Sequence, residues 1–394
     1  MSLIQSVCSL GECIDLYGGG TPSKDKPEYW NGDIPWASVK DLKTNRIECT
    51  QDSITALGLT NSSSKMVKAG SIVIATRMAV GRVAISEIDV AINQDLKAIV
   101  CSENVDVNYL FYFLASQEAR FSRLASGATV KGIKINHILD MKIPLPPLAE
   151  QQKIAAILDA ADSLRKKDQQ LIDHYTTLSQ SLFLEMFGDP VTNSMGWNVK
   201  KLGDISKKIT DGEHQNPPVA DKGMNLIMAK DVLGDRVDFS KPRYVNDEDY
   251  NKYIKKCNPE NGDVLLVSRG ATVGRCTVVN TNIPFCLMGS VILLKPDINI
   301  LGLYISYIFK HHNFSKRLVN VSSASAQQAI YINHLKKLII PSPPIELQNL
   351  FADRIAIIEK QKQQAKASLE KSNALFNSLL QRAFNGELTG NKAA

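Results

Sequence analysis

The stretch that decides the fold is residues 143–187, which read IPLPPLAEQQKIAAILDAADSLRKKDQQLIDHYTTLSQSLFLEMF. Proline lacks the amide donor of a helical turn and crowds the turn before it, so the prolines at 144, 146 and 147 predict a helix that begins directly after Pro147. No further proline or glycine occurs before Gly188. At a rise of 1.5 Å per residue the predicted helix is roughly 60 Å long, which exceeds what one small domain needs.

Apolar residues recur three and four positions apart along this predicted helix. Such spacing indicates a single apolar seam rather than a helix that is buried on all sides. The seam comprises Ile154, Ile157, Ala161, Leu164, Leu171, Tyr175, Leu178 and Leu182.

The same pattern occurs a second time in residues 340–384, which read IPSPPIELQNLFADRIAIIEKQKQQAKASLEKSNALFNSLLQRAF. The tripeptide Ile-Asn-His precedes both copies, at 135–137 and at 332–334, so the copies lie 197 residues apart (332 minus 135). An internal repeat of half the chain determines the architecture. The second seam comprises Phe351, Ile355, Ile358, Ala365, Leu369, Phe376 and Leu379.

Composition places the chain among ordinary soluble proteins with more than one domain. It has 394 residues, of which 44% are hydrophobic and 22% are charged. The net charge of +6 and the pI near 8.8 favour polyanionic partners. We expect a cytoplasmic protein, because no signal peptide opens the sequence, no run approaches 18 apolar residues, and the seven cysteines contain no C-x-x-C pair.

The region before each proline run has the pattern of a mixed α/β domain. Residues 71–86 read as two strands joined near Met78 to Gly81, and Tyr109 to Ala125 read as an amphipathic helix. Both segments have counterparts in the second half of the chain, at 261–279 and 304–318. The sequence therefore predicts one scaffold used twice.

The loops of the two copies differ. Residues 18–36 and 210–226 share almost nothing, and the second copy lacks a counterpart of the segment from Trp30 to Trp36. Two copies of a scaffold with divergent loops indicate one task performed on two different targets.

We therefore expect an α/β protein in which two domains are joined by two long antiparallel helices, as a coiled coil with a pseudo-two-fold internal repeat. The second helix starts at the second domain and must bury its own seam, so its simplest partner is the first helix, reached by running back. The expected segments are a first domain (1–147), a central helix (148–189), a second domain (190–344), a C-terminal helix (345–386) and a tail (387–394).

Six segments carry a family resemblance: GGTPS at 19–23, YWNGDIPWASVKDL at 29–42, IPLPPLAEQQKIAAIL at 143–158, FGD at 187–189, IPSPPIELQ at 340–348 and FNGEL at 384–388. Together, and in this order, they make the chain resemble the specificity subunit of Type I restriction-modification systems over essentially its full length. The resemblance implies two target recognition domains, each of which reads one half of a bipartite site on double-stranded DNA. The paired helices would set the spacer and dock two methyltransferase subunits, which restriction subunits join.

The same resemblance implies that the chain is not an enzyme and has no catalytic or metal-binding residues. DNA methylation and cleavage, with the S-adenosylmethionine, ATP and Mg²⁺ that they use, would belong to the partner subunits.

Candidate DNA contacts fall into recurring and divergent residues. Arg77 and Arg82 recur as Arg269 and Arg275 beside a glycine-bearing turn, which favours a grip on phosphate or a repeated scaffold salt bridge over base reading. Lys40-Asp41 recurs as Lys230-Asp231, and the same reasoning favours scaffold or backbone contact. The divergent loops supply the candidates for base reading, and Lys131 and Lys134 are candidates for phosphate. The divergent candidates are Lys24, Lys26, Lys43 and Arg46 in the first domain, and His214, Gln215, Asn216, Lys222 and Arg236 in the second.

Three further interpretations remain open. Trp30 and Trp36 could stack on bases, although their setting among prolines and glycines favours a packed loop. Residues 216–219 read NPPV and resemble the Asn-Pro-Pro-aromatic motif of amino-group DNA methyltransferases, but Val219 removes the aromatic ring that stacks on the flipped base. A structural coiled-coil adaptor is the other alternative.

Overall fold

The computed structural model describes residues 6–127, 129–215, 220–241, 243–320 and 329–388. Its contacts divide the chain into two compact units. Unit 1 comprises residues 1–169 and 367–394, and unit 2 comprises residues 170–366. Each unit thus contains one α/β domain with half of each long helix. Within the described ranges, no helix is both long enough and apolar enough to cross a membrane.

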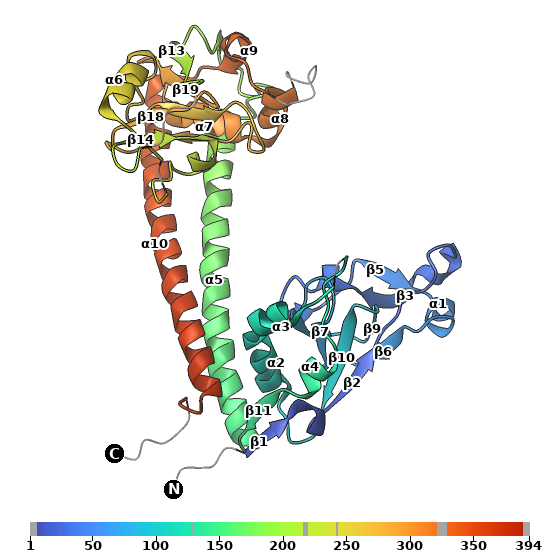
Figure 1. The fold of residues 1–394 in the computed structure, drawn as a ribbon. Coiled ribbons are helices and arrows are strands. Elements are labelled where there is room, and N and C mark those ends of the chain that lie inside the picture. The colour runs from blue at the N-terminus through green and yellow to red at the C-terminus, as the bar shows by residue number, and fades with distance from the viewer. Residues whose placement is uncertain (1–5, 128, 216–219, 242, 321–328, 389–394) are drawn as a thin grey trace. The chain divides into compact units, whose positions relative to one another are not determined.

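Two helices of 40 residues, α5 (Leu148–Phe187) and α10 (Ile345–Phe384), follow the two proline runs (Figure 1). Each begins directly after a proline pair, as the missing proline amides predict. The predicted antiparallel pairing is confirmed within each unit. In unit 1 the start of α5 shares a core with the end of α10, and in unit 2 Phe187 at the end of α5 packs on Phe351 near the start of α10.

The face that α5 turns inward differs from the predicted seam. Ile157, Leu164, Leu171 and Leu178 are 39–43% exposed, so half of that prediction was wrong. Their places on the inward face are taken partly by polar residues whose hydrogen bonds and ion pairs are made inside the protein. The seam of α10 is confirmed, because all seven of its residues are buried or half-buried. The inward polar residues of α5 include Asp162, Arg165, Asp168 and Ser179.

The domain of unit 1 is built on two sheets and a strand pair. The larger sheet has the order β2-β10-β7-β8-β4, the smaller has the order β5-β3-β9-β6, and β1 pairs with β11. The strands are β1 (Ser6–Ser9), β2 (Ile14–Gly18), β3 (Trp30–Ala37), β4 (Arg46–Ile47), β5 (Asp52–Ile54), β6 (Lys65–Val67), β7 (Ile72–Ala75), β8 (Val83–Ser86), β9 (Val90–Ile92), β10 (Leu96–Cys101) and β11 (Lys142–Leu145). The helices are α1 (Ala56–Thr60), α2 (Val107–Ser116), α3 (Glu118–Leu124) and α4 (Asn136–Leu139).

The domain of unit 2 repeats this plan. Its sheets have the orders β13-β19-β16-β17 and β15-β14-β18, and β12 pairs with β20. The strands are β12 (Val199–Lys201), β13 (Ser206–Asp211), β14 (Met224–Ile227), β15 (Arg243–Val245), β16 (Val264–Val267), β17 (Cys276–Val278), β18 (Phe285–Leu287), β19 (Val291–Pro296) and β20 (Ile339–Pro341). The helices are α6 (Asp247–Lys256), α7 (Gly302–Lys310), α8 (His312–Asn320) and α9 (Ile332–Lys337).

The strand that contains the tryptophans does have a structural counterpart, although the sequence comparison found none. Trp36 of β3 pairs in parallel with Ala91 of β9, and Leu226 of β14 pairs in parallel with Cys286 of β18. The strand recurs while its side chains do not, because backbone pairing places no demand on the identity of those side chains.

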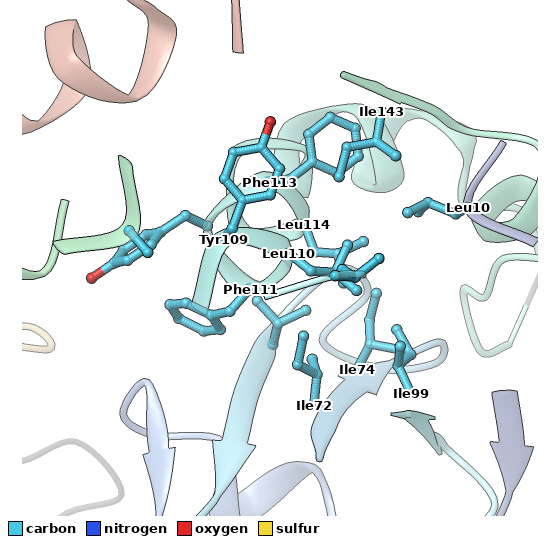
Figure 2. Close-up of a cluster of buried hydrophobic side chains, with 14 of the residues drawn as sticks. Leu10, Ile72, Ile74, Ile99, Tyr109, Leu110, Phe111, Phe113, Leu114 and Ile143 are labelled. Atoms are coloured by element: carbon cyan, nitrogen blue, oxygen red, sulfur yellow. The ribbon is translucent and has the colours of Figure 1, made fainter. Parts of the chain in front are cut away.

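The core of unit 1 is centred on α2, which is buried on all sides rather than amphipathic. Its six consecutive residues 109–114 are all buried, and Figure 2 shows the five of them that it labels above Ile72, Ile74 and Ile99 of the larger sheet. The predicted single helix ends at Ser116 and resumes as α3 from Glu118. The same cluster includes Ile154 of α5, so α2 joins the domain to the long helices.

A buried glutamine at the start of each long helix fastens it to its domain. Gln151 and Gln348 are 1% and 0% exposed, and they occupy equivalent positions in the repeat. Each side-chain oxygen accepts a hydrogen bond from a loop amide, and each amide nitrogen donates to two backbone carbonyl oxygens. For Gln151 the partners are Asp106 N at 2.9 Å, Asn104 O at 2.9 Å and Pro146 O at 2.8 Å. For Gln348 they are Leu301 N at 2.9 Å, Asn299 O at 3.3 Å and Pro343 O at 2.9 Å.

Candidate nucleic-acid interface

Four segments of unit 1 that are distant in sequence meet at one end of its larger sheet. The loop after β2 joins the turn between β9 and β10 through a hydrogen bond from Gly20 N to Ile92 O at 3.0 Å. Thr76, at the end of β7, donates its amide to Asp95 O at 2.8 Å and accepts at its carbonyl from Ile133 N at 2.9 Å. Hydrogen bonds between backbone groups therefore fix the relative positions of these loops.

Gly19 is required by this close approach. A Cβ atom at Gly19 would lie 2.2 Å from Ile92 O, and one at Gly212 would lie 2.1 Å from Leu287 O. Unit 2 thus makes the same loop crossing, with Glu213 N donating to Leu287 O at 2.8 Å. In both units, the loops that differ in sequence therefore begin immediately after this close contact between two backbone segments.

Arg77 and Lys131 lie together at this end of the sheet. Met78 N donates to Lys131 O at 3.2 Å, and the Arg77 side chain packs over Gly132. Arg77 is 48% exposed and lies 3.6 Å from Asp95 in a weak ion pair. The side chains of Lys131 and Lys134 are exposed.

Arg82 lies with Arg77 on the turn that joins β7 to β8. Gly81 there has a positive φ of 88°, a conformation that glycine adopts without strain, and a Cβ atom at Gly81 would touch Phe121. The Arg82 guanidinium is exposed and has no hydrogen-bond or ion-pair partner among the described residues.

Sequence reasoning missed Lys97, which is half-buried beside Gly18 and near Arg77. Its ammonium group donates to the carbonyl oxygens of Gln94 and Leu96 at 3.2 and 3.3 Å. Burial lowers the pKa of Lys97, and the nearby Arg77 lowers it further while Asp95 opposes both. A single lysine inside a strand gives no sequence signal for this placement.

The backbones of Arg269 and Arg275 in unit 2 make the same pairings and hydrogen bonds as those of Arg77 and Arg82 in unit 1. Arg77 pairs with Gly132 and Arg269 pairs with Ala329 as isolated β-bridges. Ala75 N donates to Arg82 O and Val267 N donates to Arg275 O, both at 2.8 Å.

The ion pair of Arg77 is not repeated. Ser268 N donates to Ser290 O where Thr76 N donates to Asp95 O, so a serine replaces the aspartate. Among the described residues, Arg269 has no carboxylate partner. A repeated salt bridge therefore does not account for the repeated arginine.

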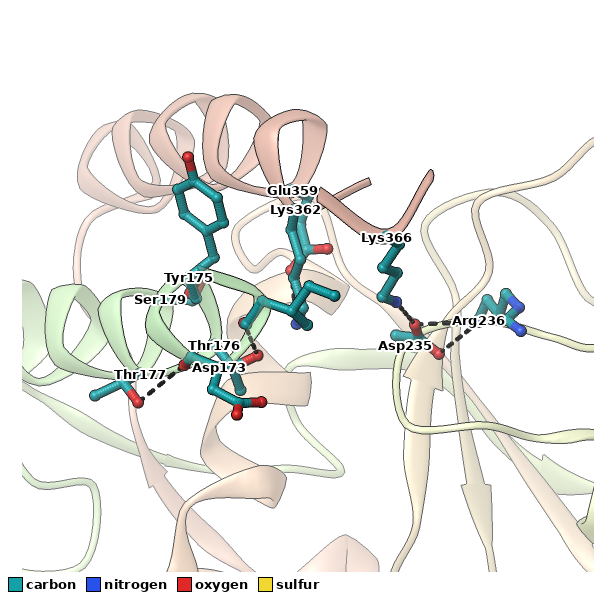
Figure 3. Close-up of polar contacts among 11 residues, drawn as sticks. Asp173, Tyr175, Thr176, Thr177, Ser179, Asp235, Arg236, Glu359, Lys362 and Lys366 are labelled. Carbon is teal, nitrogen blue, oxygen red and sulfur yellow. Dashed lines mark hydrogen bonds and ion pairs between the residues drawn. The ribbon is translucent and has the colours of Figure 1, made fainter. Parts of the chain in front are cut away.

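Arg46 and Arg236 are engaged in other contacts. Arg46 forms an ion pair with Glu87 at 2.8 Å and donates to Asn108 Oδ1 at 2.8 Å, at the end of β8 remote from Arg82. Arg236 pairs with Asp235 at 3.2 Å (Figure 3). These contacts indicate scaffold roles for both arginines, and their contact with DNA stays a prediction.

The tryptophans pack as the sequence indicated. Trp36 is 5% exposed and donates its indole N–H to Gly20 O at 3.1 Å, and Trp30 donates to Ser23 O at 3.0 Å. Their rings meet edge to face with centroids 5.1 Å apart. The pair thus holds the loop of residues 18–23 in place.

Lysines 24, 26 and 43 lie exposed on the loops of unit 1. Lys26 donates to Tyr29 Oη at 3.0 Å, so it also has a local structural contact. Of the recurring Lys40-Asp41 pair, the aspartate forms part of the scaffold, whereas the Lys40 side chain is exposed. Asp41 accepts from Ser38 N at 2.8 Å, and Asp231 accepts from Met228 N at 2.9 Å.

In unit 2, His214, which is a candidate for base reading, belongs to a cluster of charged side chains at the end of β13. Asp211 lies 2.8 Å from His214 Nε2 and 2.8 Å from Lys256 Nζ. Burial raises the pKa of Asp211, but Lys256 and His214 outweigh burial and hold that pKa below its usual value. Lys256, at the end of α6, is a second residue that sequence reasoning missed. Gln215 and Lys222 are exposed nearby in sequence, and Asn216 with the rest of the NPPV segment lies outside the described residues.

Comparison with known proteins identifies the family. The family model described as the Type I restriction modification DNA specificity domain matches residues 5–174 and again residues 195–371. The chain belongs to this family. The two matched segments also confirm that the domain occurs twice.

Curated relatives carry the corresponding description. The chain is 39% identical to the EcoR124I/EcoR124II specificity subunit of Escherichia coli over 163 residues, which is 40% of each chain. It is 29% identical to the MjaIX specificity subunit of Methanocaldococcus jannaschii over 224 residues, 52% of this chain and 51% of that one. The chain thus spans about half, or less, of the length of these two relatives. It is 24% identical to the EcoprrI specificity subunit of Escherichia coli over 373 residues, 89% of this chain and 86% of the relative.

Solved structures share the fold. The S subunit of a Type I restriction-modification system from M. genitalium superposes with a TM-score of 0.59 at 16% identity, covering 96% of both chains. A chain from a study of complex assembly and conformational transition in the type I R-M system gives a TM-score of 0.56 at 19% identity, covering 97% of this chain and 98% of that one.

Proposed function

We propose that this chain is the DNA-recognising specificity subunit of a Type I restriction-modification complex. Each α/β domain reads one half of a bipartite site on double-stranded DNA. The subunit itself carries out no chemistry. Two methyltransferase subunits, together with restriction subunits, supply methylation and cleavage.

The observation that carries this proposal is the recurrence of Arg77 as Arg269 on the same backbone frame without its carboxylate partner. An arginine retained in both copies for a scaffold ion pair would keep its aspartate, yet Ser290 stands in that place. A group common to both half-sites satisfies this pattern, and the DNA phosphate is such a group. Arg77, Arg82, Arg269 and Arg275 therefore hold the backbone, with Lys131 and Lys134 beside them in the first domain.

Base reading is assigned to the loops that differ between the copies. Lys24 and Lys43 in the first domain, and His214, Gln215, Asn216 and Lys222 in the second, have side chains that can pair with guanine or adenine edges. Because these loops leave a shared backbone crossing at Gly19 and Gly212, they can change without disturbing the sheet beneath them.

Four exposed aliphatic side chains of α5 support docking of partner subunits. Ile157 and Leu164 in unit 1, and Leu171 and Leu178 in unit 2, repeat every seven residues and are about 40% exposed. A regular heptad stripe on a helix surface is suited to another helix.

The cofactors of the complex, namely S-adenosylmethionine, ATP and Mg²⁺, belong to the partner subunits in this proposal. A cytoplasmic location follows from the site of its DNA substrate. It is supported by the seven cysteines, all of which are free thiols.

The experiment is to purify the chain, measure its binding to DNA with and without the methyltransferase subunit, and map methylated bases in host DNA. A split motif, methylated only when this chain is present, is the expected result. Methylation by the chain alone would instead make Asn216 to Pro218 an active site. Failure of both binding and methylation with the partner present would favour the structural adaptor.

A further inference from the structure

Two of the seven cysteines lie side by side in unit 1. Cys8 Sγ is 3.6 Å from Cys13 Sγ. Cys8 is on β1, and Cys13 follows a short 3-10 helix (Leu10–Glu12) that ends with a hydrogen bond from Cys13 N to Leu10 O at 3.0 Å. This turn reverses the chain, so that the two sulfur atoms meet. No second pair of thiols in contact is found among the residues that the structure describes.

Comparison with unit 2 shows that the fold does not require these two thiols. Lys200 of β12 occupies the place of Cys8 in the equivalent strand pair. Ile205 occupies the place of Cys13, because each accepts a hydrogen bond at its carbonyl oxygen from the amide that follows the equivalent strand, β10 or β19. Cys13 and Ile205 are both 4% exposed. An aliphatic side chain therefore fills the buried position equally well, and packing alone does not explain a pair of cysteines.

The two thiols differ in their access to solvent. Cys8 is half-buried beside Val7, which is 61% exposed, so a small oxidant can reach it. Cys13 lies beneath it in the core. Burial, and next the neighbouring Cys8, raise the pKa of Cys13 well above its ordinary value, so Cys13 stays protonated. Because the thiolate is the reactive form, Cys8 is the thiol that meets an oxidant first, and Cys13 is the one that reacts second.

We propose that Cys8 and Cys13 are a redox-modification site that a hydroperoxide converts to an intramolecular disulfide. The Cys8 thiolate attacks one peroxide oxygen, the O–O bond breaks, and Cys8 becomes a sulfenic acid while the other oxygen leaves as hydroxide. The Cys13 sulfur then displaces the hydroxyl group from the Cys8 sulfur, and the S–S bond forms as the Cys13 proton leaves with that hydroxyl as water. Two thiols are thereby oxidised, and one hydrogen peroxide is reduced to two waters.

The disulfide would fasten the junction between the first domain and α5. It brings the two sulfurs from 3.6 Å to about 2.05 Å and closes a ring of residues 8–13. The strand pair β1–β11 is then joined covalently to the start of β2 in the larger sheet, and β11 leads directly into α5. Closure of so short a loop should raise the melting temperature of unit 1 by about 4–8 °C. Disulfides of cytoplasmic proteins are usually transient, so this site would respond to the oxidation state of the cell.

The test uses the full chain with Cys49→Ser, which removes an exposed thiol that could link two chains. The chain is treated with hydrogen peroxide, denatured, labelled with N-ethylmaleimide and digested with trypsin. Both cysteines lie in one tryptic peptide, residues 1–24. This peptide is expected to be lighter by two hydrogen atoms and to carry no maleimide, and dithiothreitol should restore both labels. Cleavage after Glu12 should give two fragments that remain linked until they are reduced.

Two matched variants separate the roles of the thiols, with dimedone added to trap sulfenic acids. In Cys13→Ala, dimedone should label Cys8, because the second thiol is missing. In Cys8→Ala, Cys13 should remain a free thiol. Cys101, whose strand position is opposite Ile14, should keep its maleimide label throughout. Retention of both labels in residues 1–24, while Cys49 of the unsubstituted chain is oxidised, would overturn the proposal, as would a disulfide between Cys13 and Cys101.

Two further measurements test the structural consequence. Circular dichroism must show that both alanine variants fold, and melting should show the rise of about 4–8 °C on oxidation only in the chain that has both thiols. A lower melting temperature with the disulfide formed would refute the fastening of the junction. Duplex DNA binding should be unchanged by oxidation, because Cys13 precedes β2 whereas the candidate interface begins beyond its other end, at Gly19. The site thus goes beyond the proposed function and is measured separately from it.

Discussion

Replacing Gln151 by methionine tests how the long helix is joined to the first domain. Methionine has a similar volume and fills the space, but it neither donates nor accepts the hydrogen bonds of the amide. The change leaves one buried amide N–H and two carbonyl oxygens without the partners that lie 2.8–2.9 Å away. An unsatisfied buried group costs about 1–3 kcal/mol, and carbonyl oxygens tolerate the loss better than an N–H group does. We therefore expect a loss of about 3–5 kcal/mol in the free energy of unfolding.

A loss of that size is a large part of the stability of a typical domain, roughly 5–15 kcal/mol. It should lower the melting temperature of unit 1 by about 10 °C, since a unit of this length shifts by roughly 2–4 °C per kcal/mol. Urea denaturation followed by circular dichroism, with calorimetry to resolve the two units, measures both quantities. Gln152→Met, an exposed neighbour on the same helix turn, is the matched control and should change the stability by less than about 0.5 kcal/mol. A cost below about 1 kcal/mol for Gln151→Met would refute the argument that the buried amide holds the junction.

Three further predictions concern DNA contacts, pH and helix length. Arg269→Ala should weaken binding to all duplexes alike and reduce the slope of log K against log salt by about 1, as phosphate contact requires, whereas a sequence-dependent loss would indicate base reading. The pKa of Asp211 is lowered in the folded state, so its contribution to stability is present above its ordinary pKa and is lost as pH falls through the lowered value. Thermal melts should therefore show that Asp211→Asn destabilises the protein at pH 7 but not at pH 2. Removing one heptad from the middle of both α5 and α10 should shorten the spacer between the methylated half-sites by about three base pairs, because seven residues span roughly 10 Å. Genome-wide methylation mapping that finds altered half-sites with the old spacer would contradict the proposal that the helices set the spacer length.

The sequence predicted the parts of the fold that depend on local chemistry. Pro147 and Pro344 fixed the starts of the two long helices, because a proline amide is missing wherever the residue is placed. The repeat predicted the second domain from the first. The two strands within residues 71–86 followed from apolar runs around a glycine turn, and β7 and β8 confirm them.

The parts that the sequence did not predict depend on tertiary partners. The regular spacing of Ile157, Leu164, Leu171 and Leu178 suggested a buried seam, yet Asp162 and Asp168 face inward because Asn45 and Ser372 satisfy them there. Asn45 and Asp162 are 117 residues apart, and no local pattern indicates that they meet. Lys97 and Lys256 were missed as neighbours of the candidate interface for the same reason.

Comparison of the two copies distinguishes the residues that the fold requires from the surface residues that can vary. Gln151 recurs as Gln348, and Gly19 recurs as Gly212, because each satisfies or avoids backbone atoms whose positions are set by the fold. Trp36 becomes a leucine and Asp95 becomes a serine, because side chains at the loops and the sheet end are not needed for backbone pairing. A surface group that recurs without such a structural reason is then the informative case, and Arg269 is that case. The fold explains why its backbone lies where it does, and we propose that a ligand common to both domains, the DNA phosphate, explains why the residue is arginine.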